Sequence, residues 1–324
     1  MEIKRDSGIH LPGCGVWLDS LRARPLGVVS HAHSDHAAWH EETILTPATA
    51  ALMQARRGSR NQIIHETPFH QPHEYSSARI TLIPAGHVLG SAQVLVEGEE
   101  GTLLYTGDFK LRKSLTSERA ISLRADTLVM ECTFGLPRYR FPAAEQVQTE
   151  IIAFCRKAME DRCVPVLLAY SIGKAQELLA MLEPSGLSAI LHPSVYKIAK
   201  VYERFGISFG EFEEGNGSAY EGKVFIYPPN TREQLSHISN LRIAIASGWA
   251  MEKGAIYRYA CDAAFVLSDH ADYDELLQHV QAVAPKRVFV VHGFTEEFAR
   301  DLRRLGVEAL ALEGKNQLEL PLGF

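Results

Sequence analysis

The residues best suited to chemistry follow a short apolar run at 26–29, which reads as a buried strand. Three histidines and one aspartate occupy six positions there: His31, His33, Asp35 and His36. An extended chain cannot point all of them to one side, so we expect the segment to wrap around something. Imidazole and carboxylate groups together suit Zn, Mn or Fe, and two ligand groups this close suggest two adjacent metals. A histidine-rich surface loop is the alternative, and the strand before the motif argues against it.

Further residues of the same types lie at the ends of later predicted strands or in turns. Asp19 ends the strand at 14–20, His87 lies in a glycine-flanked turn, and Asp108 follows the strand at 102–106. Each has an ordinary explanation when taken alone, because Gly-Asp is a common turn and most single histidines are hydrogen-bonded polar residues. Their order after the first cluster makes them candidates. Later strands end in the remaining ones: Glu131, His270 and His292.

Composition places the chain among ordinary globular proteins. Its 324 residues are 46% hydrophobic and 22% charged, enough for two domains or one domain with a large insertion. No apolar run approaches the ~20 residues needed to cross a membrane, and no secretory signal is visible. The five cysteines are scattered without a CxxC pair, which favours a cytoplasmic location. Because the net charge is −6, any nucleic acid must be held by a local basic surface or by the metals.

The predicted elements divide the chain into three parts. A helix at 44–60 precedes strands at 79–84, 93–97, 102–106 and 126–130. Beyond a connector at 137–142, helices and strands alternate, which implies parallel pairing in a three-layer unit. The pattern of a strand followed by acidic and histidine residues then returns. We therefore predict a first part at 1–138, an inserted domain at 139–257 and a second part at 258–324.

In this order the candidates resemble the metallo-β-lactamase superfamily. That resemblance implies an α/β fold, an αββα sandwich of two face-to-face sheets with helices outside. It also implies two divalent metal ions, Zn or alternatively Mn. The first would be held by His31, His33 and His87. The second would be held by Asp35, His36 and a late histidine, taken as His292, with Asp108 bridging the two. Asp19 would orient the first cluster, since ligating histidines usually bond to an outer carboxylate.

The later segments are similar to the β-CASP nuclease branch. The features are Glu131, the long insertion, the run 268–273 around His270, and Val-His-Gly at His292. The stretch 173–179 also looks like the cleavage-factor nucleases of that branch, and 247–250 resembles compact bacterial nucleases encoded with DNA ligases. A DNA exonuclease working beside a ligase and a helicase is therefore implied. His292 stands where RNA-processing members tend to have histidine, so an RNA-processing endo- or exonuclease of the 3′-end cleavage-factor type is the alternative.

Two metals can lower the pKa of a water and neutralise an in-line phosphoryl transition state. If His292 is a ligand, His270 is left to donate a proton to the departing 3′ oxygen. The resemblance pairs Glu131 with His270, which would raise the pKa of that imidazole. Products would carry 5′-phosphate and 3′-hydroxyl ends. The simpler interpretation of Glu131 is a salt bridge at a strand end.

Contacts to nucleic acid are predicted in three places. The turn before the helix at 172–182 offers backbone N–H groups and a lysine for a phosphate: Ser171, Gly173 and Lys174. The most basic stretch, 110–124, begins with Lys110, and the connector combines charges with a ring: Arg138, Tyr139 and Arg140. A helix cap and solvated side chains are the alternatives. Four histidines in polar loops are expected at the surface: His40, His65, His70 and His73.

Two functions of other classes compete with the nuclease. A thioester or lactone hydrolase would use the same metals but has no need of the insertion, His270 or Glu131. A catalytically silent scaffold that binds nucleic acid predicts broken ligands, and none of the candidates is missing.

Overall fold

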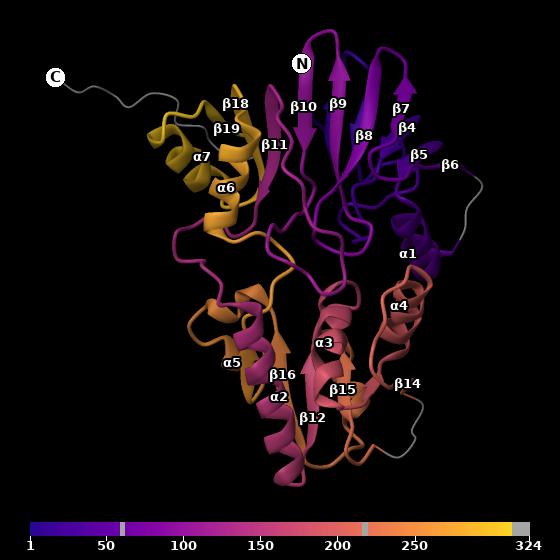
Figure 1. Cartoon of the computed structure of the whole chain (residues 1–324), viewed down its shortest axis with the longest axis vertical. Coiled ribbons are helices and arrows are strands. Elements are labelled where there is room, and N and C mark those ends of the chain that lie inside the picture. Colours follow the sequence, from indigo (N-terminus) through magenta and orange to yellow (C-terminus); the bar gives the residue numbers. More distant parts are fainter. Residues whose placement is uncertain (59–61, 216–219, 313–324) are drawn as a thin grey trace, which may run out of the picture.

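A computed structural model of the chain describes residues 1–58, 62–215 and 220–312. One half of the molecule contains two β-sheets (Figure 1). The first is six-stranded, in the order β1 (Lys4–Arg5), β2 (Ile9–Leu11), β3 (Val16–Leu18), β4 (Leu26–Val28), β5 (Glu42–Leu45) and β6 (Ile63–Glu66). The second is seven-stranded, in the order β19 (Ala309–Ala311), β18 (Arg287–Gly293), β11 (Thr127–Cys132), β10 (Gly101–Tyr105), β9 (Ala92–Gly98), β8 (Ala78–Pro84) and β7 (Pro72–Tyr75).

The two sheets pack face to face over one apolar core. Side chains from both contribute to it, among them Leu18 and Val28 from the first sheet and Val94, Leu103 and Val129 from the second. Helices α6 (Tyr273–Val283) and α7 (Thr295–Arg304) cover the outer face of the second sheet. Helix α1 (Pro47–Arg57) packs on the other side with the loop that follows β4. This αββα sandwich confirms the predicted fold class.

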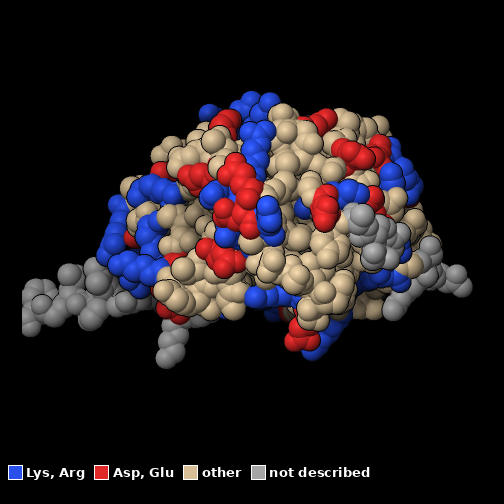
Figure 2. Space-filling view, turned by 90° about the horizontal axis from the view of Figure 1, so that it is seen from below, with Lys and Arg blue, Asp and Glu red and all other residues tan. Residues whose placement is uncertain are grey.

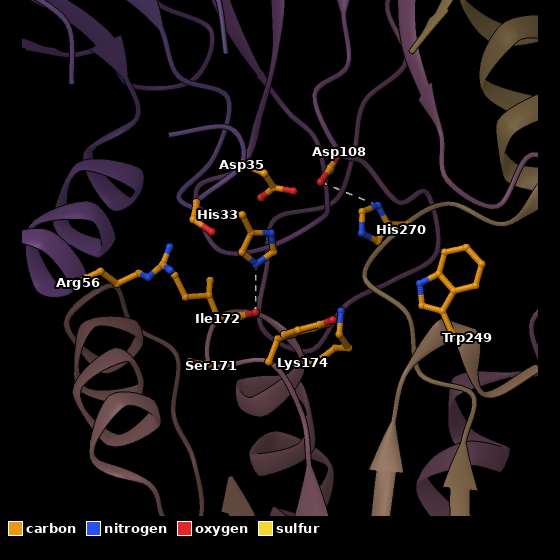
Figure 3. A pocket seen from close by; sticks show the side chains of 11 residues that line it. His33, Asp35, Arg56, Asp108, Ser171, Ile172, Lys174, Trp249 and His270 are labelled. Carbon is orange, nitrogen blue, oxygen red and sulfur yellow. Dashed lines mark hydrogen bonds and ion pairs between the residues drawn. The ribbon is translucent and has the colours of Figure 1, made fainter. Parts of the chain in front are cut away.

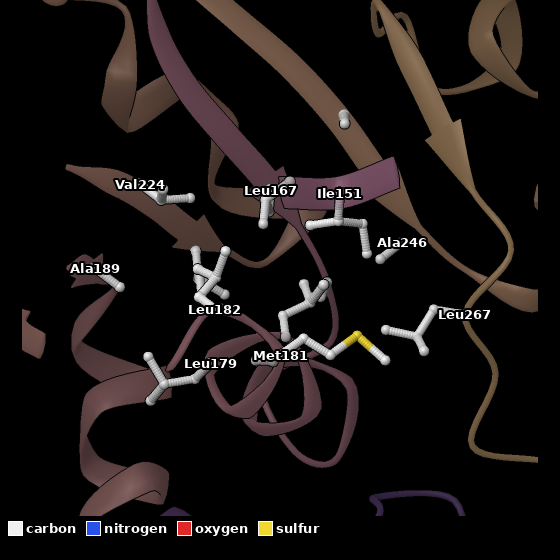
Figure 4. Packing of buried hydrophobic residues seen from close by; sticks show 14 of the residues in the cluster. Ile151, Leu167, Leu179, Met181, Leu182, Ala189, Val224, Ala246 and Leu267 are labelled. Carbon is white, nitrogen blue, oxygen red and sulfur yellow. The ribbon is translucent and has the colours of Figure 1, made fainter. Parts of the chain in front are cut away.

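The inserted unit is a third, wholly parallel sheet. Its order is β14 (Phe212–Glu214), β13 (Ala189–Leu191), β15 (Val224–Tyr227), β12 (Val164–Leu168), β16 (Leu241–Ala246) and β17 (Ala263–Phe265). Helices α2 (Ala144–Glu160), α3 (Lys174–Leu182) and α4 (Pro193–Arg204) and the short α5 (Ala255–Arg258) accompany it. Figure 4 shows its core, where Ile151 of α2 and Leu179 of α3 pack with Leu167 of β12.

The end of this sheet lies beyond the predicted limit of the insert. Strand β17 pairs in parallel with β16, although the prediction assigned residues 258–324 to the sandwich. The chain therefore crosses back to the sandwich after Phe265 rather than after residue 257, because sheet pairing continues to that residue. The other predicted bounds stay predictions. No helix among residues 1–58, 62–215 and 220–312 is both long and apolar enough to cross a membrane.

The helix predicted at 44–60 begins three residues later than expected. Ile44 and Leu45 belong to strand β5, which pairs with β4 and β6. Thr46 then caps the helix, its hydroxyl accepting a hydrogen bond from the backbone N–H of Thr49, and Pro47 fills the first helical turn. The apolar side chains that suggested a longer helix are instead those of a buried strand end.

One buried histidine outside the candidate site gives a pH-dependent stability. His279 of α6 is fully buried against Phe109, with Ser122 Oγ at 2.8 Å from its Nδ1, and burial lowers its pKa to about 3. The imidazole of the unfolded chain has a pKa of about 6.5. Between about pH 3 and this pKa, the unfolded chain therefore binds more protons than the folded protein does. The free energy of unfolding should therefore fall as the pH drops, by about 1.4 kcal/mol per pH unit from this group. Urea unfolding at several pH values should show that slope reduced in His279→Gln and retained in a control at the exposed His237.

Candidate metal centre

Three of the candidate residues meet because parallel strands end at one edge of the second sheet. Strands β10, β11 and β18 are parallel neighbours, and they deliver Asp108, Glu131 and His292 to that edge. The ladder between β11 and β18 shifts register after Glu131, and His292 and Gly293 have φ of 56° and 93°. A bulge of this kind re-aims a side chain next to an active site. The register of these strands thus determines where the three side chains lie.

Among the described residues, the largest group of candidate ligands has four side chains. His31, His33, His87 and Asp108 each offer one ligand atom, and these atoms all lie within 4.8 Å of one another. The Nδ1 of His33 is 3.1 Å from His31 Nε2 and 2.9 Å from His87 Nε2. Asp108 Oδ2 is 3.4 Å from His31 Nε2 and 3.7 Å from His87 Nε2. In a tetrahedral site with bonds of about 2.0–2.1 Å, donors lie roughly 3.3–3.4 Å apart, so the spacing suits a metal.

The tautomers of these histidines follow from their other contacts. The Nδ1–H of His31 donates to Ser30 Oγ at 2.9 Å, and the Nδ1–H of His87 donates to the carbonyl of Asp269 at 2.7 Å. The Nε2–H of His33 donates to the carbonyl of Ile172 at 3.2 Å. Burial lowers the pKa of His31 and His87 well below the usual value, so each ring is neutral and has one proton. Unprotonated nitrogens therefore face one another, an arrangement that needs a cation between them.

Asp19 lies beneath the first cluster. Its carboxylate accepts hydrogen bonds from the backbone N–H of Ser30, from Tyr105 Oη at 2.9 Å and from the Nδ1–H of His36 at 2.8 Å. Asp19 is buried and has a φ of 47°. These bonds fix the His36 ring so that its Nε2 faces Asp108 Oδ2 at 3.4 Å. The acid therefore orients a candidate ligand without facing the centre itself.

The second predicted set is more open. His36 is buried, and its ring centroid lies 5.3 Å from that of His292, which is half-buried, while Asp35 is exposed. Burial acts to lower the pKa of His36. The carboxylates of Asp108 and Asp19 outweigh this effect and raise the pKa to about 10. The same negative potential would stabilise a divalent cation. Among the described residues, the groups whose ligand atoms lie within 4.8 Å of one another include neither Asp35 nor His292. The side chains of this second set would therefore have to move closer together to bind a metal.

His270 and Glu131 lie in direct contact. Both carboxylate oxygens of the fully buried Glu131 lie 3.0 Å from His270 Nδ1. Burial acts to lower the pKa of His270. The carboxylates of Glu131 and Asp108 outweigh this effect and raise the pKa to about 9. The Glu131 carboxylate also accepts hydrogen bonds from the Phe109 N–H and from Thr133. His270 is thus a protonated imidazole that Glu131 orients, 4.0 Å from Asp108 and beside the group of four.

The insert supplies contacts that sequence reasoning missed. Ile172, in the turn between β12 and α3, accepts the hydrogen bond from His33, and Asp269 accepts that from His87. Lys174 pairs with the Asp269 carboxylate in the interior. A Cβ on Gly173, whose φ is 86°, would lie 3.0 Å from Asp269 Oδ2. Asp269 lies inside the 268–273 run that carried the resemblance, and that was the available signal for it.

A cleft of about 490 Å³ opens beside these residues. Figure 3 shows His33, Asp35, Asp108 and His270 on one side of it, with Ser171 and Lys174 opposite. Arg56 lies at one end and Trp249 at the other. Arg56 donates to the carbonyl of Ala32 at 2.7 Å, which holds α1 against the histidine segment. Neither Arg56 nor Trp249 was among the predicted site residues.

The residues predicted to contact phosphate lie in different environments. Ser171 lines the cleft, but Lys174 is engaged with Asp269, and Lys110 is only 4% exposed and lies near Glu177. Both lysines are therefore interior residues and do not face the cleft as free cations. The connector arginines are exposed, and each has an acidic partner, Arg138 with Glu252 at 3.3 Å and Arg140 with Asp274 at 2.8 Å.

The far end of the insert offers no single-sign surface. Figure 2 shows acidic and basic side chains interspersed across this end, with basic side chains gathered at its left edge. That mixture agrees with the overall charge of −6.

Replacing Lys174 by Met should weaken metal binding as well as stability. The change leaves the buried Asp269 carboxylate with His270 Nε2, at 3.9 Å, as its remaining close ion-pair partner, and breaking a buried pair typically costs about 3–5 kcal/mol. The carbonyl of Asp269 orients His87, and that of Ile172, two residues before Lys174, orients His33. Affinity for a metal held by these histidines should therefore fall about 10- to 100-fold. Lys200→Met, which breaks the exposed pair with Glu203, should change stability by less than about 1 kcal/mol. Chelator competition and urea unfolding measure the two effects, and unaltered metal affinity in Lys174→Met would contradict the role of this contact.

Comparison with known proteins defines the class. Residues 262–312 match the family described as the Zn-dependent metallo-hydrolase RNA specificity domain. A crystal structure of a protein of unknown function from Enterococcus faecalis shares the fold, with a TM-score of 0.61 at 11% identity over 88% of this chain and 78% of that one. The chain belongs to the metallo-β-lactamase fold family, in its β-CASP branch, as the sequence predicted. The donor set fits a divalent metal of the kind that this family uses.

Three relatives are more specific. The chain is 49% identical over 323 residues to a protein named "Probable DNA ligase" from Opitutus terrae, covering 98% of this chain and 32% of that protein. It is 29% identical to chicken "5' exonuclease Apollo" over 58% of this chain and 43% of that protein. It is 26% identical to mouse "DNA cross-link repair 1A protein" over 60% of this chain and 21% of that protein. The chain thus spans less than half the length of each of these relatives.

Proposed function

We propose that the protein is a metal-dependent nuclease that hydrolyses phosphodiester bonds of DNA as an exonuclease. The observation that carries this proposal is the convergence of unprotonated nitrogens from His31, His33 and His87 on the Asp108 carboxylate. Zinc is the expected metal, with manganese as the alternative, because the donors are imidazole and carboxylate groups. Two ions are proposed, the second held by Asp35, His36 and His292, since His36 also faces Asp108.

Divalent ions held there would activate a water and neutralise charge on the phosphoryl group. The residues of the chain divide the remaining work. Asp19 orients His36, and Glu131 keeps His270 protonated and turned toward the cleft. His270 can then protonate the departing 3′ oxygen, which leaves 5′-phosphate and 3′-hydroxyl ends. The exposed arginines Arg138 and Arg140 remain candidates for backbone contacts at the domain junction.

The names of the relatives favour DNA. The Apollo and cross-link repair proteins are named for exonuclease action and DNA repair. The relative named as a ligase contains a counterpart of nearly this whole chain within a protein about three times its length. A nuclease that leaves 5′-phosphate and 3′-hydroxyl ends makes what a ligase joins, so a DNA ligase is the proposed partner, with a helicase of the same pathway.

An RNA-processing nuclease of the 3′-end cleavage-factor type is the second candidate. It is favoured by the RNA specificity description of residues 262–312 and by His292. A thioester or lactone hydrolase is less well supported, because the insert contacts the candidate ligands directly and His270 has its own carboxylate partner.

The deciding experiment offers end-labelled single-stranded DNA, duplex DNA and RNA, each with and without a 5′-phosphate, to the zinc- and manganese-loaded protein. We expect progressive shortening of DNA and slower action on RNA. Faster cleavage of RNA would select the second candidate. Thioester turnover without strand cleavage by either metal form would reject the nuclease.

A further inference from the structure

Arg112 binds the main chain of His270, the proposed proton donor. It lies in the segment between β10 and β11, and its guanidinium donates a hydrogen bond to the His270 carbonyl at 2.6 Å. Ser268 Oγ donates a second bond to this carbonyl at 3.2 Å and accepts one from the His270 N–H at 3.0 Å. The peptide groups on both sides of His270 are therefore held, while its ring faces the cleft beside Asp108 (Figure 3).

Arg112 is itself fixed at the start of α6. Its guanidinium lies 2.9 Å from Glu275 Oε2 and 3.7 Å from Asp272 Oδ2, and its backbone N–H also donates to Glu275. These two carboxylates form the capping box of α6, in which each accepts a hydrogen bond at 3.0 Å from the backbone N–H of the other residue. The ring of Phe141 lies on the guanidinium, with 4.8 Å to the ring centroid. His270, two residues before this cap, is thus tied through one arginine to the end of a helix.

The same segment also fixes Glu131, which contacts the ring of His270. Phe109 donates its N–H to Glu131 Oε1 at 2.9 Å, and its carbonyl accepts the N–H of Ala271 at 2.6 Å. Residues 109–112 therefore hold both the carboxylate that orients the imidazole and the main chain that carries it. This segment begins directly after Asp108, which faces candidate ligands of both proposed metals. The position of the proton donor relative to the metals is thus set through one stretch of chain.

The guanidinium suits this place better than another cation would. It is planar and has five N–H donors, so it can meet a carbonyl and a carboxylate at once, whereas a lysine ammonium is a single point of charge. A general acid works only when its donor atom comes within about 2.6–3.2 Å of the oxygen that it protonates. A displacement on the order of 1 Å in the main chain can therefore cost about 100-fold in rate.

We propose that Arg112 is a positioning residue for His270: it holds the His270 carbonyl against the start of α6 and so keeps the imidazole within reach of the departing 3′ oxygen. This rests on the proposed nuclease function and adds a residue that controls protonation of the leaving group without contacting substrate or metal. An ion pair that only stabilised α6 would change the folded fraction of the protein and would slow every substrate equally.

The test compares two leaving groups in single-turnover reactions of the zinc- or manganese-loaded protein. One substrate is the DNA that the wild type cleaves fastest, and the other is a thymidine p-nitrophenyl phosphate ester, whose leaving group needs no proton. Arg112→Gln should cleave DNA about 10- to 100-fold more slowly and the ester less than about threefold more slowly, with unchanged zinc content. The ratio of the two rates does not depend on how much of the protein is folded. Arg79→Gln, which breaks the exposed pair with Glu74 at 2.8 Å, should leave this ratio at the wild-type value.

Two further variants make the assignment specific. In a His270→Ala background, Arg112→Gln should cause no further loss on DNA beyond about twofold, because Arg112 acts through the imidazole that has been removed. Arg112→Lys keeps a positive charge beside Glu275 but loses the planar fork. It should therefore fold and show the same dependence on the leaving group with a smaller loss.

The outcomes separate this inference from the proposed function. If the metal-loaded wild type cleaves no nucleic acid, the nuclease function fails and this inference fails with it. If the wild type cleaves, three results overturn this inference alone: Arg112→Gln slows DNA and ester equally, it loses bound zinc, or it slows His270→Ala as much as it slows the wild type. The same comparisons with Arg112→Lys decide the matter if Arg112→Gln does not fold.

Discussion

Asp108→Ala should abolish cleavage while the protein remains folded. Its carboxylate faces His31, His36 and His87 at 3.4–3.7 Å, so its removal takes a shared donor from both proposed metals. We expect kcat to fall on the order of 1,000-fold or more, the scale at which a single preorganised electrostatic contact acts. Burial raises the pKa of Asp108, so the metal-free fold should tolerate the loss of this buried acid.

The test measures the rate of cleavage and, by mass spectrometry, the amount of bound metal. Asp108→Ala should bind less than the wild-type amount of zinc and keep the wild-type circular dichroism spectrum. Asp274→Asn is the matched control, because it removes an exposed carboxylate that pairs with Arg140 at 2.8 Å. Wild-type zinc content in a folded Asp108→Ala protein would show that this carboxylate is no ligand.

His270→Ala should slow cleavage about 100- to 10,000-fold with both metals retained, the range for loss of a general acid. Glu131 lies 3.0 Å from its Nδ1, and we propose that the imidazole serves as a proton donor. The defect should shrink on a thymidine p-nitrophenyl phosphate ester, because p-nitrophenolate leaves without a proton. Glu131→Gln should show the same dependence on the leaving group with a smaller loss.

Metal analysis decides between the two late histidines. His292→Ala should lose one equivalent of zinc, whereas His270→Ala should lose none. The reverse result would exchange the roles of His270 and His292. An equal defect on both kinds of leaving group would rule out proton donation by His270.

The proximity of some candidate residues follows from strand order. Asp108 and Glu131 lie at or just after the ends of the parallel neighbours β10 and β11, which brings them to one edge of the second sheet, whereas His31 follows β4 of the first sheet. Contacts between distant segments were not predictable in the same way. Lys174 and Asp269 are 95 positions apart, and a lysine before a helix reads as a free phosphate ligand until the packing is known. The strand pairing of β17 with β16 likewise depends on which sheet has a free edge.

His40 shows the same limit. Its polar surroundings predicted a solvated residue, yet it is 3% exposed, and a Cβ on Gly27 would lie 2.1 Å from its ring. The space for this imidazole exists because Gly27 has no side chain, a relation that neither residue reveals alone. His70 is exposed as predicted, while His65 and His73 are half-buried, with ring centroids 4.8 Å apart and ring planes tilted by 54°.

The carbonyls of Ile172 and Asp269, which accept the protons of His33 and His87, have a kinetic consequence. The Ile172 carbonyl belongs to the insert and the Asp269 carbonyl to the segment that returns to the sandwich after Phe265, so both bonds lie at the junction of the two units. We expect a strand bound in the crevice to cover these imidazoles and to slow the release of the ions. Chelators would strip the idle protein faster than the engaged one.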